Sequence, residues 1–438
     1  MRVYKVMLEA YLDFLQAFTA DEFIRLFWFF FILELPRYVV LDYLILGYRA
    51  LKRPKLDEAY EQARHRLWLE QPLVSVIVPG KNEGKNYYQL ARTLREQTYL
   101  NYEIIIVDDG SDDDSFLIGR DLERCGIIDR FISNPIRGGK ASGANLALRY
   151  ARGTYILHLD ADCSLNRDAM ERMIIPFYLN PEIGAVGGAL AVRNADASIC
   201  TTLQGIEYHV AITMGRLVSG TLGILRIISG AFGAFRRDIL DQVGGWDIGP
   251  GLDGDITVKI RKAGYRIHFD AHALALTDVP VTFKKLAKQR LRWQRSLIRF
   301  RLRKHFDVFW AHKGFSLLNF LSFAENIFYN LVLNVLWYIY MYDVVTNFTP
   351  YLGAIIVTNI LLYSAAKCVQ FAAFLLFSRQ WRDHLGLIPY LPLMSFYTGY
   401  FLRAVRTTSY FSEFFFKASY KDPWNPEKTS KMALKHGM

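Results

Sequence analysis

Between residues 73 and 280, short apolar runs rich in β-branched residues alternate with stretches of helical periodicity. Such alternation is typical of βαβ units, which build a mostly parallel sheet covered by helices. In a sheet of this kind, ligands bind at the carboxyl ends of the strands. The apolar runs lie at 73–79, 103–108, 129–133, 154–160, 184–188, 229–235 and 265–270, and helical stretches include 85–97, 140–152 and 168–179.

The sequence on either side of this α/β domain is far more apolar than the domain itself. Residues 23–46 are long enough to cross a bilayer, but charged residues and Pro36 interrupt them, which predicts a kinked span or an interfacial helix. Residues 281–312 are basic, aromatic and amphipathic, and we expect them to lie along a membrane surface. Further spans are predicted at 323–342, 351–378 and 385–402.

Two features of these segments set the expected topology. In 385–402, Pro389 and Pro392 favour a re-entrant or interfacial element over a full crossing. The chain has a net charge of +11, and its basic residues gather next to the apolar segments. This placement is typical of the cytoplasmic face of an anionic membrane and favours a lipid bilayer over nucleic acid as the partner. We therefore expect a multi-pass protein of the inner cell membrane with a cytoplasmic α/β domain.

Pairs of carboxylates follow two of the predicted strands. Asp108 and Asp109 end one run, and Asp160 and Asp162 end another. A carboxylate at such a strand end can accept the N–H group of a pyrimidine base. Asp160 and Asp162, pointing the same way along an extended strand, would repel each other unless a cation lies there. A hard divalent ion completed by substrate phosphates fits this arrangement.

Two strand-to-helix turns carry further polar residues. The first strand leaves through Pro79 and reaches Asn82 and Glu83 where a ligand would meet the sheet. Lys140 begins a helical stretch behind two glycines, and an ammonium group at a helix N-terminus suits a diphosphate. Taken alone, both turns are also compatible with ordinary connections between a strand and a helix.

A third pair of carboxylates, Asp253 and Asp255, lies in a glycine-rich loop just before a helical stretch. A carboxylate here can take the proton from an acceptor hydroxyl, and a general base typically contributes about 10²–10⁴-fold to a rate. The alternative is that Asp253 caps the helix.

The most distinctive run is KQRLRWQRS at 288–296. Arginine pairs in bidentate fashion with phosphate oxygens, and Trp293 offers a flat face on which a sugar ring can stack. A basic helix on a membrane surface with an interfacial tryptophan is the alternative. That alternative leaves the carboxylate motifs upstream unexplained.

In this order, VDDGS, DAD, D-G-D and Q-R-L-R-W resemble the processive members of glycosyltransferase family 2, such as cellulose, chitin, hyaluronan and poly-N-acetylglucosamine synthases. The resemblance covers roughly residues 70–300 and includes LQGIEYHVAITMGR (203–216) and SGAFGAFRR (229–237). It implies an α/β, Rossmann-like GT-A fold. It also implies an inverting transfer from a UDP-sugar to a growing polysaccharide, giving a β-linkage.

The resemblance further implies roles for single residues. Asp109 would bind the uracil, Asp162 would hold Mg²⁺ or Mn²⁺, and Asp253 would be the general base. Because Leu252 stands where the family commonly has Glu, Asp255 is the competing base. The donor nucleotide would contact Pro79, Asn82, Glu83, Asp108, Asp109, Lys140 and Asp160, and the acceptor or diphosphate would contact Asp255, Ser229, Gly230, Gln289, Arg290, Arg292 and Trp293.

We expect five regions along the chain. Membrane or interfacial helices and a basic linker fill 1–60, the GT-A domain 70–280, interfacial helices with QRLRW 281–320, the transmembrane region 321–416, and a cytoplasmic tail 417–438. In the tail, Trp424 is the centre of a hypothetical gating segment over the donor. The expected partners are the UDP-sugar, the polysaccharide, the bilayer and an export or accessory subunit. The alternatives are a transferase that moves one sugar to a polyprenyl phosphate and a non-catalytic membrane scaffold.

Overall fold

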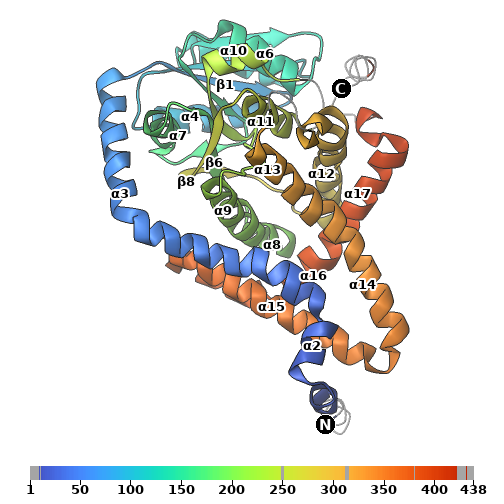
Figure 1. The fold of residues 1–438 in the computed structure, drawn as a ribbon. Coiled ribbons are helices and arrows are strands. Elements are labelled where there is room, and N and C mark those ends of the chain that lie inside the picture. Colours follow the sequence, from blue (N-terminus) through green and yellow to red (C-terminus); the bar gives the residue numbers. More distant parts are fainter. Residues whose placement is uncertain are drawn as a thin grey trace. The chain divides into compact units, whose positions relative to one another are not determined.

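A computed structural model describes residues 9, 11–247, 251–310, 315–378, 380–421 and 431 (Figure 1). The chain divides into two compact units. One comprises residues 1–50 and 325–404, and the other comprises residues 51–324 and 405–438.

The second unit contains an eight-stranded sheet in the order β3-β2-β1-β4-β7-β6-β8-β5. β1 pairs in parallel with β2 and β4, β2 with β3, and β6 with β8, whereas β7 is antiparallel to β4 and β6, and β5 is antiparallel to β8. The mostly parallel α/β sheet predicted from the sequence is thus confirmed. The strands are β1 (Val74–Gly80), β2 (Tyr102–Asp109), β3 (Arg130–Asn134), β4 (Tyr155–Leu159), β5 (Ser164–Leu165), β6 (Ile183–Val192), β7 (Phe232–Arg236) and β8 (Arg266–Thr277).

Helices cover both faces of this sheet, which is why its central strands are apolar on both sides. One core cluster joins alternate strand residues such as Val76 and Ile104 to Leu90, Leu122 and Met173 on three helices. These helices are α4 (Gly84–Arg95), α5 (Ser115–Arg124) and α7 (Ala169–Leu179).

On the opposite face lies α6 (Lys140–Tyr150), which approaches the sheet closely. A Cβ atom added to Gly143 would lie 3.0 Å from the Pro79 Cβ, so a larger residue there would push α6 and β1 slightly apart. The close packing sets the start of α6, and with it Lys140, beside the carboxyl ends of β1 and β2. The remaining helices of this unit are α8 (Ile199–Glu207), η3 (Tyr208–Met214), α9 (Gly215–Thr221), α10 (Arg237–Val243), α11 (Leu252–Lys262), α12 (Phe283–Ser296), η4 (Leu297–Lys304) and η5 (Phe306–Phe309).

The basic stretch that follows β8 forms α12, η4 and η5. Several of its arginines are buried within the second unit instead of forming an exposed basic face: Arg290, Arg299 and Arg301 are at most 6% exposed. Arg303 pairs with the fully buried Glu413 at 2.7 Å. Much of the positive charge that we assigned to a membrane surface therefore serves ion pairs and cation–π contacts inside this unit.

The first unit is helical. Two charged residues in 23–46 form ion pairs with residues from the C-terminal part of this unit. Arg37 lies 2.8 Å from Glu325, and Glu34 lies 3.1 Å from Arg403. The helices that lie wholly in it are α2 (Ala20–Leu26), η1 (Phe29–Glu34), η2 (Pro36–Val40), η6 (Phe328–Val332), α14 (Leu333–Asn347), η7 (Thr349–Tyr351), α15 (Leu352–Phe377), η8 (Trp381–Tyr390), α16 (Leu393–Phe396) and η9 (Tyr397–Phe401). Three helices contain residues of both units: α3 (Leu41–Glu70), α13 (Leu317–Ile327) and α17 (Leu402–Phe416). The short helix η10 (Ala418–Lys421) belongs to the second unit.

Within the described residues, one helix, Thr349–Phe377, is long and apolar enough to cross a bilayer. The pair Trp381–Tyr390 and Leu393–Phe416 passes the same criterion only jointly and is bent by 70°. This bend agrees with the broken element expected from Pro389 and Pro392. Because 23–46 and 323–342 do not qualify, the predicted multi-pass arrangement is not supported.

Candidate active site

The ends of β1, β2 and β4 lie level with one another. Gly80 at the end of β1 is the partner of Asp108, and Ile77 is the partner of His158 on β4. The residues that follow these strands therefore meet at one edge of the sheet, as predicted. The charge of Glu83 interacts with those of Asp160 and Asp162, and burial together with these two charges raises the pKa of Glu83 above its ordinary value.

Asp108 and Asp109 are both buried, but their carboxylates accept hydrogen bonds from different partners. The Asp108 carboxylate accepts hydrogen bonds from the backbone and hydroxyl of Ser111 and from the Ser133 hydroxyl. The Asp109 carboxylate accepts one backbone N–H from Gly138 and one from Gly139, each at 2.7 Å. These bonds hold the glycine turn before α6. They leave lone pairs on Asp109, since a carboxylate has about four acceptor positions.

Asn82 ties the first turn to the second. Its backbone has φ = 60°, in the left-handed region that asparagine tolerates better than most residues. Its N–H donates to the Ser111 hydroxyl at 2.8 Å, and its side-chain oxygen accepts the N–H of Asp112 at 3.1 Å. The polar residues after β1 and β2 thus form one connected rim.

Lys140 lies at the first position of α6, after Gly139 with φ = 92°. Its ammonium group is 2.5 Å from Asp160 and donates to the Gly230 carbonyl at 3.3 Å. Burial acts to lower the pKa of Lys140, but the charges of Asp160 and Asp253 outweigh it and raise this pKa above its ordinary value. A permanently charged ammonium group at a helix N-terminus is well suited to a diphosphate.

Asp160 and Asp162 are not on one extended strand, and this expectation was wrong. β4 ends at Leu159, and the Cys163 N–H donates to the Asp160 carbonyl, which closes a turn. The two carboxylates nevertheless repel each other. Burial and the negative charge of Asp160 raise the pKa of Asp162 to about 6.

The Asp160–Asp162 turn fits a divalent cation, because a cation would relieve the repulsion that Lys140 offsets only in part at Asp162. The Thr277 hydroxyl donates a long hydrogen bond of 3.4 Å to the Asp162 carboxylate. Within the part of the chain that the structure describes, no group of three or more His, Cys, Asp or Glu side chains could hold a metal by itself. Substrate phosphates would have to complete the coordination.

Asp253 and Asp255 lie on α11 but have different surroundings. Asp255 is fully buried, 2.7 Å from the Lys304 ammonium and 2.7 Å from His305 Nε2. These two partners hold the pKa of Asp255 below its ordinary value against the effect of burial. Its carboxylate is therefore occupied by an internal ion pair and is poorly suited to contact a substrate.

Asp253 faces the carboxylate rim instead. Its Oδ1 is buried and has no hydrogen-bond partner among the described residues. Burial raises the pKa of Asp253. The positive charge of Lys140 opposes this effect, and the negative charge of Asp160 reinforces it. It lies against Gly230, where an added Cβ would come within 2.1 Å of Oδ1. Gly230 and the neighbouring Ser229 thus form the loop that admits Asp253.

The QRLRW residues divide between two faces of α12. Arg290 is 6% exposed, pairs with Glu207 at 2.9 Å and places its guanidinium 4.5 Å from the centre of the Trp293 ring. Trp293 itself is 39% exposed, so part of its indole is available for a ligand. In this arrangement Arg290 supports Trp293, and the predicted contact of Arg290 with a diphosphate stays a prediction.

Gln289, Arg292 and Trp293 share a face of α12 with Ser296, at helical spacings of three and four residues. A Cβ added to Gly251 would lie 2.3 Å from the Ser296 Cβ, so this face meets the start of α11, which carries Asp253. Gln289 Oε1 is buried without a hydrogen-bond partner among the described residues. Tertiary packing thus brings the QRLRW face and the proposed base together.

Four residues near the site were not singled out from the sequence: His158, Glu207, Tyr208 and Arg216. Glu207 holds Arg290, and Tyr208 interacts with the charges of Arg290 and Arg216. His158 is buried under Trp246, with ring centres 5.4 Å apart. The resemblance at 203–216 marked the stretch that contains Glu207, Tyr208 and Arg216, but nothing marked the individual side chains.

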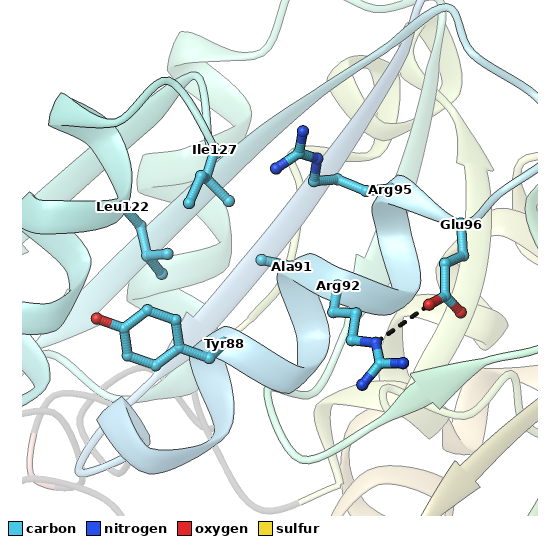
Figure 2. A pocket seen from close by; sticks show the side chains of 7 residues that line it. All are labelled: Tyr88, Ala91, Arg92, Arg95, Glu96, Leu122 and Ile127. Atoms are coloured by element: carbon cyan, nitrogen blue, oxygen red, sulfur yellow. Dashed lines mark hydrogen bonds and ion pairs between the residues drawn. The ribbon is translucent and has the colours of Figure 1, made fainter.

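Trp424 falls outside the described residues. A surface hollow beside α4 and α5, shown in Figure 2, contains none of the predicted site residues. Its rim carries the helical ion pair between Arg92 and Glu96 at 3.1 Å. The hollow is lined by Tyr88, Ala91, Arg92, Arg95, Glu96, Leu122 and Ile127.

Residues 75–244 match the protein family described as glycosyl transferase family 2. Two curated relatives, both poly-β-1,6-N-acetyl-D-glucosamine synthases, come from Staphylococcus epidermidis and Staphylococcus aureus (strain COL). Each is 33% identical, over 222 and 223 residues respectively, which is 50% of this chain and 53% of each relative. The chain thus spans about half the length of the curated relatives it matches.

A solved structure shares the fold. It is the mannosyltransferase PcManGT from Pyrobaculum calidifontis in complex with GDP-Man and Mn²⁺, with a TM-score of 0.55 and 20% identity. The match covers 86% of this chain and 99% of that chain. At this identity the likeness shows the fold alone, and it confirms the predicted GT-A architecture.

Proposed function

Because residues 75–244 of this chain form a glycosyltransferase family 2 domain, as the sequence motifs predicted, we propose that the protein is a membrane-bound, inverting polysaccharide synthase. It takes a hexose or N-acetylhexosamine from a UDP-sugar and adds it to the end of a growing polymer. The names of the two staphylococcal relatives favour UDP-N-acetylglucosamine as the donor and a β-1,6-linked product.

The observation that carries this proposal is the position of Asp253. Its unpartnered Oδ1 lies at the same rim as Lys140 and Asp160, beside the helix that presents Trp293. Asp253 accepts the proton of an acceptor hydroxyl as its oxygen attacks the anomeric carbon of the donor. The bond from that carbon to the diphosphate breaks, UDP leaves with the bonding electrons, and the configuration inverts. An α-linked donor therefore gives a β-linkage.

The chain's own residues stabilise the leaving diphosphate. Lys140 at the N-terminus of α6 supplies a positive charge, and the helix end adds backbone N–H donors. Asp162, next to Asp160, would hold Mg²⁺ or Mn²⁺, and such an ion would neutralise charge on the departing phosphates. On the acceptor side, Trp293 stacks against the terminal sugar, which keeps the polymer bound between additions.

Several finer parts of the proposal rest on the sequence. The apolar helix Thr349–Phe377 supports attachment to a membrane, with the GT-A domain in the cytoplasm. Asp109 reads the uracil, and Trp424 in the tail closes over the donor. An export or accessory subunit carries the product across the membrane. A lipid-linked single sugar is the competing product.

The test is UDP release by the purified protein from a panel of UDP-sugars in the presence of Mg²⁺ or Mn²⁺, with the product sized by gel filtration. We expect release from UDP-N-acetylglucosamine and a polymeric product. D253N should lower the rate by about 10²–10⁴-fold, the usual contribution of a general base. Full activity of D253N would remove Asp253 from this role.

The matched control is D255N. Because Asp255 sits in an ion pair with Lys304 and His305, its loss should lower the melting temperature more than that of D253N. D255N that still folds at the assay temperature should keep most of its turnover. If the product were instead a single sugar on a lipid, the polymerase assignment would be replaced by transfer to a polyprenyl phosphate.

A further inference from the structure

Arg216 on α9 is partly exposed, but one nitrogen of its guanidinium is buried. Its Nη1 is buried and has no hydrogen-bond partner among the described residues. A buried polar group left without a partner costs free energy, and in a native protein it calls for an explanation such as a catalytic role or an ordered water or ion. The nearby charge of Arg226 adds repulsion to this cost.

Asp253, which carries the opposite charge, also has a buried polar atom without a hydrogen-bond partner among the described residues. Its Oδ1 is buried without a partner, and its charge interacts with that of Arg216. The two side chains are within electrostatic range but make no hydrogen bond to each other. A guanidinium donates only, and an ionised carboxylate accepts only. A hydroxyl-bearing ligand can satisfy both, since each hydroxyl group donates and accepts.

The neighbours of Arg216 place it on the acceptor side of Asp253. Lys140 and Asp160 approach Asp253 from the start of α6 and the end of β4, which is the donor side. Arg216 approaches it from α9, next to Tyr208, which in turn interacts with Arg290 below the Trp293 ring. Arg216 is thus coupled to the proposed base and, through Tyr208 and Arg290, to the helix that carries Trp293.

We infer that Arg216 binds the acceptor sugar, with its buried Nη1 donating to an oxygen of the terminal residue while Asp253 accepts the proton of the attacking hydroxyl. The inference rests on the proposed function and adds to it a binding residue outside the recognised motifs. Arg216 fixes the sugar that stacks on Trp293, so that one particular hydroxyl faces Asp253.

The experiment compares the wild type with R216Q and R216K in Mn²⁺-containing buffer. UDP release from UDP-N-acetylglucosamine is measured at increasing concentrations of a β-1,6-linked N-acetylglucosamine tetramer, and separately without it. Loss of a hydrogen bond from a charged group should raise the acceptor KM of R216Q about tenfold or more. The donor KM and the acceptor-free release of UDP should stay within about twofold. R216K, which keeps the charge, should lie between the two.

The control is R236Q, because Arg236 is paired with Asp238 at the far end of β7 and has no part in the site. R236Q should match the wild type in both constants. Melting temperatures of all variants in detergent separate a folding defect from a binding defect. If R216Q does not fold, the same comparison is made with R216K.

Two results would overturn the inference. One is an unchanged acceptor KM in a folded R216Q, and the other is a rise in the donor KM alone, which would assign Arg216 to the nucleotide. A wild-type protein that releases no UDP from any UDP-sugar would instead contradict the proposed function itself.

Discussion

At the scale of single residues, the site depends on how closely Asp253 can approach the loop before β7. Gly230 allows this close approach, because any larger residue would put a Cβ atom 2.1 Å from Asp253 Oδ1. Gly230 also offers its carbonyl to Lys140 at 3.3 Å. One glycine therefore borders both the proposed base and the ammonium group on the donor side.

The first prediction follows from this contact. G230A should displace Asp253 and lower UDP release at least about 100-fold, the lower end of what a general base contributes. The melting temperature should fall by only a few degrees, because the change lies at a loop. G205A on α8 is the control, since its Cβ would lie at an ordinary 3.5 Å from Ala195. Equal activity of G230A and G205A would contradict the prediction.

The second prediction concerns His158, which is buried on β4 with neither ring nitrogen hydrogen-bonded among the described residues. Burial, reinforced by the Lys140 charge, lowers the pKa of His158 to about 3. The unfolded chain takes up this proton near pH 6.5, so the stabilising effect is complete above that pH and is lost as the pH falls towards 3. A single such group changes stability by at most about 1.4 kcal/mol per pH unit.

The measurement is the melting temperature of wild type and H158N between pH 7.5 and pH 4.5. The wild type should lose stability more steeply below pH 6.5 than the variant does. Other acidic groups contribute equally to both proteins, so the difference between the two slopes reports His158. Parallel curves would show that the histidine is not held neutral.

At the scale of secondary-structure elements, α12 is both a carrier of the site and a part of the core. Arg290 and Glu207 are nearly buried and hold α12 against α8, and the Arg290 guanidinium underlies the Trp293 ring. Removing one partner of a buried ion pair typically costs about 3–5 kcal/mol, because the other charge is left uncompensated. The orientation of Trp293 should depend on this pair.

We therefore predict that E207Q raises the acceptor KM and shortens the polymer while UDP release without acceptor persists. Product length on a sizing column is the measurement, and E207D should restore part of it. E182Q, which removes an exposed ion pair with Arg266, is the matched control. An E207Q enzyme with wild-type product length would show that the pair only stabilises the fold.

The basic segment was interpreted from sequence as a membrane-surface helix, and its position beside the base was not foreseen. Its charges looked like a solvated face because sequence spacing gives no information on what lies opposite. In the structure, Arg299 is 1% exposed and lies 4.1 Å from the Tyr420 ring, and Arg303 pairs with Glu413. The partners are more than a hundred residues away in sequence, beyond the reach of helical periodicity.

At the scale of the whole molecule, catalysis is expected to depend on a divalent ion. EDTA should lower UDP release at least about 100-fold, comparable to the loss of a general catalytic group, and Mn²⁺ or Mg²⁺ should restore it. D162N should not recover. As a readout independent of turnover, Mn²⁺ with UDP should raise the melting temperature of the wild type but not of D162N. Full activity in EDTA would remove the metal from the mechanism.

The sequence by itself determined the sheet, its mostly parallel order and the rim where the polar residues gather. These follow from local rules: β-branched runs alternate with helical periods, and parallel strands present their carboxyl ends at one edge. The motifs were sufficient to predict the family. The sequence could not show that β4 ends before Asp160, where the Cys163 N–H donates to the Asp160 carbonyl and closes a turn.

The tertiary structure alone decided between Asp253 and Asp255. Both lie in the first turn of α11, but positions two apart on a helix face in different directions, so one meets Gly230 and the other meets Lys304 and His305. It also decided that the Arg290 guanidinium lies 4.5 Å from the centre of the Trp293 ring and that the charge of Arg216 acts on Asp253. Such pairings join residues far apart in the chain, and only packing in three dimensions specifies them.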